Sequence, residues 1–136
     1  MPLAPSLIAA GAAIFGLLGT LHLLYTFFTD RFEPRDAAAG AAMRATSPRL
    51  TRRTSVWSAW VGFNASHSLG AMLFAAVYGL LALAHPDWLR ASPALLGLGV
   101  ATCLAYLALA ARYWFRTPLL GIALGTACFS LGALML

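Results

Sequence analysis

Charged residues are scarce in this chain of 136 residues. It contains no lysine and only four acidic residues; charged residues make up 10% of the sequence, whereas 61% of the residues are hydrophobic. A water-soluble domain of this size could not bury so much apolar surface, so the composition excludes an ordinary soluble fold. The sequence also lacks a His-Glu-x-x-His motif, a phosphate-binding glycine loop and the acid-rich motifs used with prenyl diphosphates. Several classes of membrane enzyme are therefore not indicated.

The chain contains two cysteines, and their positions indicate neither metal binding nor redox chemistry. Cys103 and Cys128 lie within apolar segments and lack the spacing of zinc or thioredoxin-like motifs. We expect both to be small packing residues. Asp30, Glu33 and Asp36 alternate with arginines that would neutralise them. We therefore predict no metal site in this sequence.

The hydrophobic residues form four long stretches. Each is at or near the roughly 20 residues that a helix needs to cross the hydrocarbon layer. A membrane β-barrel would need at least about eight short alternating strands, which leaves helices as the remaining option. We predict an all-α integral membrane four-helix bundle in a single domain, residues 1–136. The expected helices cover about 6–29, 57–84, 93–113 and 118–136, and the expected cytoplasmic link covers 30–56.

The first stretch is expected to be a retained helix. No lysine or arginine precedes it, and its apolar run is longer than the core of a typical secretory signal.

The nine arginines are distributed unevenly. Most lie in the link between the first two helices or beside the junction of the last two, and only Arg90 lies on the other side. Because positive loops stay in the cytoplasm, both termini are predicted on the non-cytoplasmic side of a bacterial cytoplasmic (inner) membrane. Topology and anionic headgroups then account for the net charge of +5 better than nucleic acid does. The arginines of the cytoplasmic side are Arg31, Arg35, Arg44, Arg49, Arg52, Arg53, Arg112 and Arg116.

The end of the link contains a sequence pattern that is typical of a helix start. Thr46, Ser47 and Pro48 resemble a helix start, with a capping hydroxyl ahead of a proline. This pattern predicts that helix two begins at Pro48, well before the membrane. Arg49, Arg52 and Arg53 would then lie on an interfacial helical extension that contacts lipid headgroups.

Polar residues within helix two suggest a site, because such residues are costly inside a membrane unless they find partners. Trp60, Asn64 and His67 are separated by four and then three residues, which places them on one helical face. We expect this face to point into the bundle. It continues through Ala71, Phe74 and Tyr78.

Helix one carries a matching histidine. Counted from the inner ends of their helices, His22 and His67 differ in depth by only about 4 to 5 Å, at roughly 1.5 Å per residue. Since the first two helices are joined by one link, we expect His22, Tyr25, Asn64 and His67 to share a site. Tyr106 on helix three could close it, and Arg112 either binds an anionic group or extends to the interface.

Several chemistries fit these residues. His22 and His67 could act as acid and base on a lipophilic substrate, with Asn64 orienting a carbonyl. The same two imidazoles could instead ligate the iron of a b-type haem. The site could also simply bind a lipid, a quinone or a similar molecule. The structural alternative is that the polar side chains only fix the packing of the helices.

Small residues form a stripe on the fourth helix. Gly121, Gly125 and Gly132 lie on one face and allow another backbone to approach closely. Internal packing is the expected use of this face, and a homodimer through the same glycines is the alternative.

Two short segments carry a resemblance to known proteins. Gly19–His22 (GTLH) and Gly62–Gly70 (GFNASHSLG) resemble a largely uncharacterised group of small four-helix bacterial membrane proteins with a His in each of the first two helices. The resemblance implies the four-span topology and no activity. We therefore rank a non-catalytic binding or accessory protein first, an enzyme second, a haem protein third and transport last.

Overall fold

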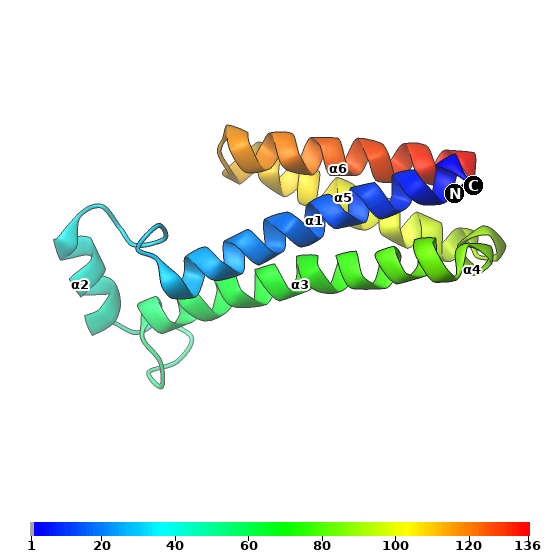
Figure 1. The fold of residues 1–136 in the computed structure, drawn as a ribbon. Helices are drawn as coiled ribbons and strands as arrows, with labels where there is room; N and C mark the ends of the chain where they lie inside the picture. The colour runs from blue at the N-terminus through cyan, green and yellow to red at the C-terminus, as the bar shows by residue number, and fades with distance from the viewer. Residues whose placement is uncertain (1) are drawn as a thin grey trace. The chain divides into compact units, whose positions relative to one another are not determined.

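The computed structural model describes residues 2–136, and the regular secondary structure of this part of the chain is entirely α-helical (Figure 1). Four of the helices are long and two are short. In chain order they are α1 (Leu3–Phe28), α2 (Ala37–Ala45), α3 (Val56–Ala84), α4 (Pro86–Ala91), α5 (Pro93–Tyr113) and α6 (Arg116–Met135).

The four predicted membrane spans are confirmed as helices. α1, α3, α5 and α6 are each long and apolar enough to cross a bilayer. Large apolar side chains remain exposed on all four, as expected where lipid rather than water surrounds the protein. Examples are Phe28 at 78%, Leu73 at 65%, Leu98 at 62% and Leu134 at 85% exposed. These features indicate an integral membrane protein.

Side-chain caps determine where several helices begin. The Ser92 side chain accepts a hydrogen bond from the Leu95 amide, and Pro93 follows at the first helical position, where its missing N–H has no cost. Asp36 caps α2 through the Ala38 amide. The Ser55 hydroxyl accepts from the Ser58 amide at 3.1 Å and so caps the first turn of α3.

The predicted helix start at Pro48 is wrong. The chain from Thr46 to Ser55 is a loop, closed by a 2.9 Å hydrogen bond from the Val56 amide to the Thr46 carbonyl. A helix here would place Arg49, Arg52 and Arg53 three and four residues apart on one face, where like charges repel. The helix begins after Ser55, whose hydroxyl caps its first turn.

The described chain forms two compact units. One comprises the residues up to Leu18 together with Ala71–Leu136, and the other comprises Gly19–Gly70. The long helices α1 and α3 each contribute to both units. A single domain over residues 1–136 therefore stays a prediction.

Aromatic rings form the core of the first unit. The Phe15 ring lies 5.1 Å from Phe74, and the Phe129 ring lies 5.4 Å from Phe74 and 5.0 Å from Tyr78. The Tyr78 hydroxyl donates to the Leu95 carbonyl at 2.8 Å, which satisfies its polar end. Ala71, Phe74 and Tyr78 are all buried, so the prediction that this face of helix two points inward is confirmed for these three residues. Trp60, at the start of the predicted face, is 40% exposed.

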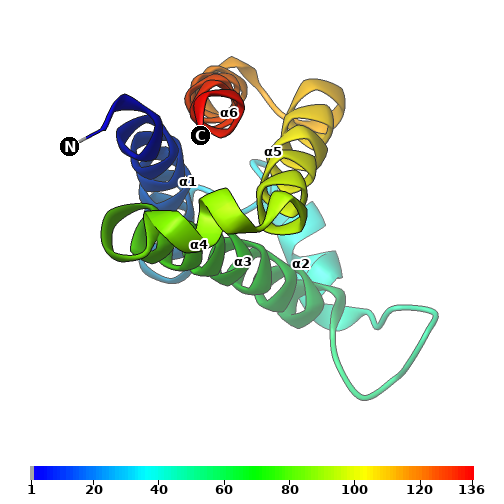
Figure 2. The same cartoon turned by 90° about the vertical axis from the view of Figure 1, so that its right-hand side faces the viewer.

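Glycines allow α1 and α6 to lie close together in the first unit (Figures 1 and 2). A Cβ at Gly11 would lie 2.7 Å from the Gly125 carbonyl oxygen, and one at Gly132 would lie 2.8 Å from the Ala4 carbonyl oxygen. A Cβ at Gly121 would lie 3.0 Å from the end of the Leu18 side chain, a looser contact than the other two. α1 of the same chain therefore covers the glycine face of α6, as the internal-packing interpretation predicts. A homodimer through Gly121, Gly125 and Gly132 would need a face that is already occupied.

The cysteines have the packing environment that we expected. Cys103 is fully buried in the apolar core, and the Thr126 hydroxyl donates to its carbonyl oxygen at 3.4 Å. Cys128 is partly buried, and both thiols are free.

Candidate functional site

The second unit brings the predicted polar residues of α1 and α3 together. His22 Nε2 lies 2.9 Å from Asn64 Oδ1, and the centroids of the His22 and His67 rings are 5.3 Å apart. Asn64 is buried, with 6% of its surface exposed, and both histidines are partly buried. The expected proximity of the two histidines is thus confirmed, while the use of the cluster stays a prediction.

The hydrogen bonds of Asn64 fix the proton position on His22. The Asn64 amide nitrogen donates to the Trp60 carbonyl at 2.8 Å, a partner that can only accept. The amide oxygen must therefore face His22, and His22 Nε2 must be the donor of that bond. In the neutral imidazole the acceptor is then Nδ1. The cluster thus presents a defined tautomer.

The two imidazoles contact each other directly. Their planes are inclined by 64°, so the rings meet edge to face. A porphyrin between them would have to separate rings that now touch. Within residues 2–136 no group of three or more His, Cys, Asp or Glu side chains is placed to hold a metal ion.

The link after α1 folds back onto this cluster. The Phe32 ring lies 4.5 Å from the His22 ring, and the Phe32 carbonyl accepts a 3.1 Å hydrogen bond from Trp60 Nε1. Phe32 therefore covers one side of His22, and Trp60 holds the link in place.

Arg44 contacts both the link and the start of α3. Arg44 donates to the Glu33 carboxylate at 2.9 Å, and its guanidinium lies 4.4 Å from the centre of the Trp57 ring. The cation–π contact and the ion pair together connect α2, the link and α3.

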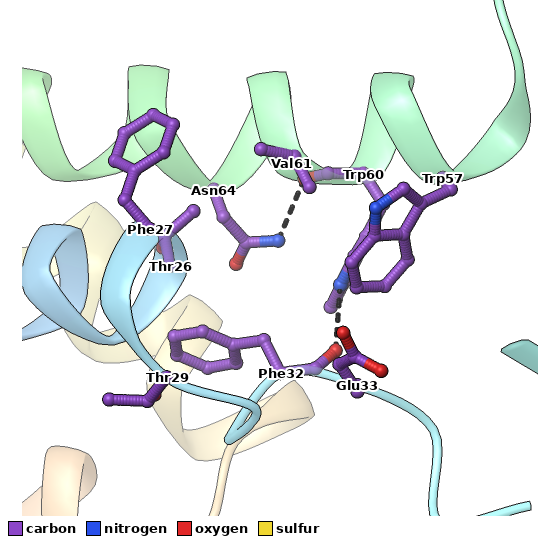
Figure 3. Close-up of a pocket in the computed structure, with 9 residues that line it drawn as sticks. All are labelled: Thr26, Phe27, Thr29, Phe32, Glu33, Trp57, Trp60, Val61 and Asn64. Atoms are coloured by element: carbon purple, nitrogen blue, oxygen red, sulfur yellow. Dashed lines mark hydrogen bonds between the residues drawn. The ribbon is translucent and has the colours of Figure 1, made fainter. Parts of the chain in front are cut away.

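A pocket of about 210 Å³ lies beside the histidine cluster and is partly open (Figure 3). Asn64 belongs to both the cluster and the pocket, whereas His22 and His67 are not among the pocket's lining residues. The Asn64 amide projects from α3 toward the Phe32 ring in the middle of the view (Figure 3). The lining residues are Thr26, Phe27, Thr29, Phe32, Glu33, Trp57, Trp60, Val61 and Asn64.

Other residues predicted for the site are not among those that line the pocket. Tyr25 lies under the Arg31 guanidinium at 4.8 Å and does not line the pocket. Tyr106 and Arg112 belong to the first unit, where Tyr106 packs edge to face on Phe15 and Arg112 lies 5.3 Å from the Tyr113 ring. A role for Tyr106 or Arg112 in ligand binding stays a prediction.

Phe32, Glu33 and Trp57 line the pocket but were not among the residues predicted for the site. A usable signal was present, since Phe32 is the one aromatic residue between Asp30 and Ser55. An aromatic side chain in an otherwise polar link indicates that the link folds back onto apolar surface.

Comparison of the chain with protein-family models, with curated proteins and with solved structures gives no match. The resemblance carried by the two histidine segments therefore stays a prediction.

Proposed function

We propose that this protein is a small integral membrane binding or accessory protein that holds a lipid or another lipophilic molecule in the pocket beside Asn64. The observation that supports this proposal is the composition of the pocket wall. It combines the aromatic side chains of Phe27, Phe32, Trp57 and Trp60 with a buried amide. Pockets for small molecules are typically apolar and aromatic, with a few oriented polar groups.

The size of the pocket limits what it can enclose. Its volume of about 210 Å³ lies below the roughly 300–1,000 Å³ of typical drug-sized sites. The pocket therefore fits a headgroup or a ring, while a longer apolar tail would extend along the exposed apolar faces of α1 and α3.

The polar groups of the pocket can still form hydrogen bonds with such a ligand. The hydroxyls of Thr26 and Thr29 donate to backbone carbonyls, and the Thr29 oxygen also accepts from the Arg31 amide at 3.3 Å, so each oxygen can still accept at least one further bond. Asn64 retains one N–H after it donates to Trp60. A ligand with both a donor and an acceptor in its polar part is therefore the best fit.

We also propose the orientation of the protein. The arginine-rich link after α1 and the junction of α5 with α6 would face the cytoplasm, and both termini would face the opposite side of a bacterial inner membrane. The pocket would then lie at the cytoplasmic ends of α1 and α3.

Catalysis by His22 and His67 is a second candidate function. The proximity of the two rings favours it, because two imidazoles with centroids 5.3 Å apart could serve as acid and base on one bound substrate. A third alternative, axial haem ligation, predicts a Soret band in protein purified gently from native membranes, and that band would be lost in both His22→Ala and His67→Ala.

Native mass spectrometry of the detergent-released protein tests the proposal. The wild-type protein is expected to carry a lipophilic molecule that is absent from Asn64→Leu, which fills the polar end of the pocket with an apolar side chain. Ser66→Ala is the control, because the Ser66 hydroxyl is exposed and bonds only the Phe63 carbonyl of its own helix. Equal bound mass in wild type and Asn64→Leu would contradict the proposal.

A further inference from the structure

The loop Thr46–Ser55, named here the arginine loop, carries three arginines without ion-pair partners. In the part of the chain that the structure describes, the two salt bridges are Glu33 with Arg44 and Asp87 with Arg90. The sequence contains no acidic residue between Asp36 and Asp87. Arg49, Arg52 and Arg53 therefore form a local cluster of positive charge that the protein itself does not neutralise.

The arginine loop and the end of α2 also border a wide, open hollow of about 640 Å³ at the surface. Arg49 and Arg52 line it together with the hydroxyl-bearing residues Thr46 and Ser47. Guanidinium groups and hydroxyls are the groups that bind phosphate oxygens in proteins, because they supply several donors and a positive charge. The chemistry of the hollow is therefore that of a phosphate site.

The middle of the loop carries one exposed apolar side chain. Leu50 is 94% exposed and stands directly between Arg49 and the Thr51–Arg53 segment. A leucine so exposed to water is unfavourable, since burying such a side chain is worth about 1.5–3 kcal/mol. An exposed leucine flanked by arginines matches the layered chemistry of a bilayer surface, where acyl chains lie beneath phosphates.

The position of the loop fits the same interpretation. The bond from the Val56 amide to the Thr46 carbonyl joins both ends of the loop at the first residue of α3. Because α3 is a membrane span, its first turn lies near the bilayer surface, and the loop lies there with it. In Figure 2 the segment between α2 and α3 extends as an open loop away from both helices.

We propose that the arginine loop binds the phosphate groups of anionic phospholipids. Arg49 and Arg52 contact a headgroup within the hollow, Arg53 adds to the local positive charge, and Leu50 inserts among the acyl chains. This site is separate from the pocket beside Asn64, and it does not depend on that pocket binding a ligand.

Native mass spectrometry with added lipid tests this inference. The full-length protein in detergent is titrated with phosphatidylglycerol and with phosphatidylcholine of the same acyl chains. We expect preferential binding of phosphatidylglycerol, and a loss of about fivefold in its affinity for each arginine removed in Arg49→Gln/Arg52→Gln. Arg35→Gln, an exposed arginine of the same link outside the loop, is expected to bind like wild type.

Two further measurements distinguish a phospholipid headgroup from free inorganic phosphate as the ligand. Leu50→Ser is expected to weaken phosphatidylglycerol binding, and millimolar inorganic phosphate is expected not to displace the lipid. Displacement by inorganic phosphate, with Leu50→Ser unchanged, would identify a soluble phosphate site and overturn the proposal. Equal phosphatidylglycerol affinity in wild type and the double variant would overturn it as well. Because the loop is exposed, circular dichroism is expected to show unchanged helix content in every variant.

Discussion

Asn64 connects more of the candidate site than any other single residue does. Its side chain accepts from His22 and donates to the Trp60 carbonyl, and its backbone carbonyl accepts from the Ser68 hydroxyl at 2.9 Å. The amide accepts through its oxygen and donates through its nitrogen without a charge, whereas leucine can do neither and an ionised aspartate can only accept, so neither residue can replace both bonds. Asn64 therefore fixes His22 and one wall of the pocket together.

Replacing Asn64 is expected to destabilise the protein modestly. In Asn64→Leu the His22 N–H and the Trp60 carbonyl lose their side-chain partner. Side-chain hydrogen bonds in membrane proteins average about 0.6 kcal/mol and reach about 1.7 kcal/mol, so we expect a loss of that order in the free energy of unfolding. Thermal unfolding in detergent measures the change against Ser66→Ala. A melting temperature equal to that of the control would show that the bond to His22 contributes nothing.

At the scale of elements, the contact between α1 and α6 depends on the absence of side chains. A Cβ at Gly11 would lie 2.7 Å from the Gly125 carbonyl oxygen and 2.8 Å from the Phe129 amide nitrogen, both backbone atoms. Backbone atoms cannot rotate away as the end of a flexible side chain can, so the two helices would have to separate.

Gly11→Ala is therefore expected to lower the free energy of unfolding by about 1–3 kcal/mol, the usual cost of overpacking. Gly97→Ala in α5 is the matched control, because a Cβ there meets no atom within 4 Å. Unfolding in increasing concentrations of sodium dodecyl sulfate compares the two variants. If Gly11→Ala and Gly97→Ala unfold together, the close packing of α1 on α6 is incorrect.

Contacts of Arg44 hold the short helix α2 near α3. Its side chain and that of Glu33 are 45% and 44% exposed, so solvent screens the ion pair and limits its contribution to below about 1 kcal/mol. In Arg44→Gln we expect faster amide exchange in α2 and unchanged exchange in the spans, measured by hydrogen–deuterium exchange. Arg35→Gln serves as the control. Unchanged exchange in α2 would show that Arg44 does not restrain it.

The four spans and the link differ in how well the sequence predicts their structure. The spans were predictable because a bilayer requires about 20 apolar residues and satisfied backbone bonds, which leaves few alternatives. The link was not predictable in the same way. Pro48 satisfied the local rules for a helix start, but the residues after it form a loop, and the hydroxyl that caps the first turn of α3 is that of Ser55.

The sequence predicted the histidine cluster of the candidate site but not the pocket beside it. Helical spacing located Asn64 and His67 on one face, and matched depth located His22 beside them. The return of Phe32 onto His22 depends on tertiary contacts of an irregular segment, for which the sequence has no periodicity. The pocket was missed because two of its lining residues, Phe32 and Glu33, come from that segment.

At the scale of the whole molecule, the proposed topology makes a simple prediction. A reporter that is active only in the cytoplasm should be active when inserted after Arg53 and inactive when fused after Leu136. The reason is the excess of arginines in the link, which retains that side in the cytoplasm. A reporter in the turn beside Arg90 should behave like the C-terminal fusion. The opposite pattern would reverse the orientation.

The central claim is that His22 and Asn64 form a hydrogen-bonded pair beside the pocket of a membrane-embedded protein. Nitrogen-15 NMR of histidine-labelled protein in lipid bilayers tests this claim most directly, with His67→Gln and His85→Gln used to assign the signals. We predict that His22 carries its proton on Nε2, and that the shift of this nitrogen changes in Asn64→Leu. A neutral His22 protonated on Nδ1, or an Nε2 shift that is the same in Asn64→Leu, would contradict the account.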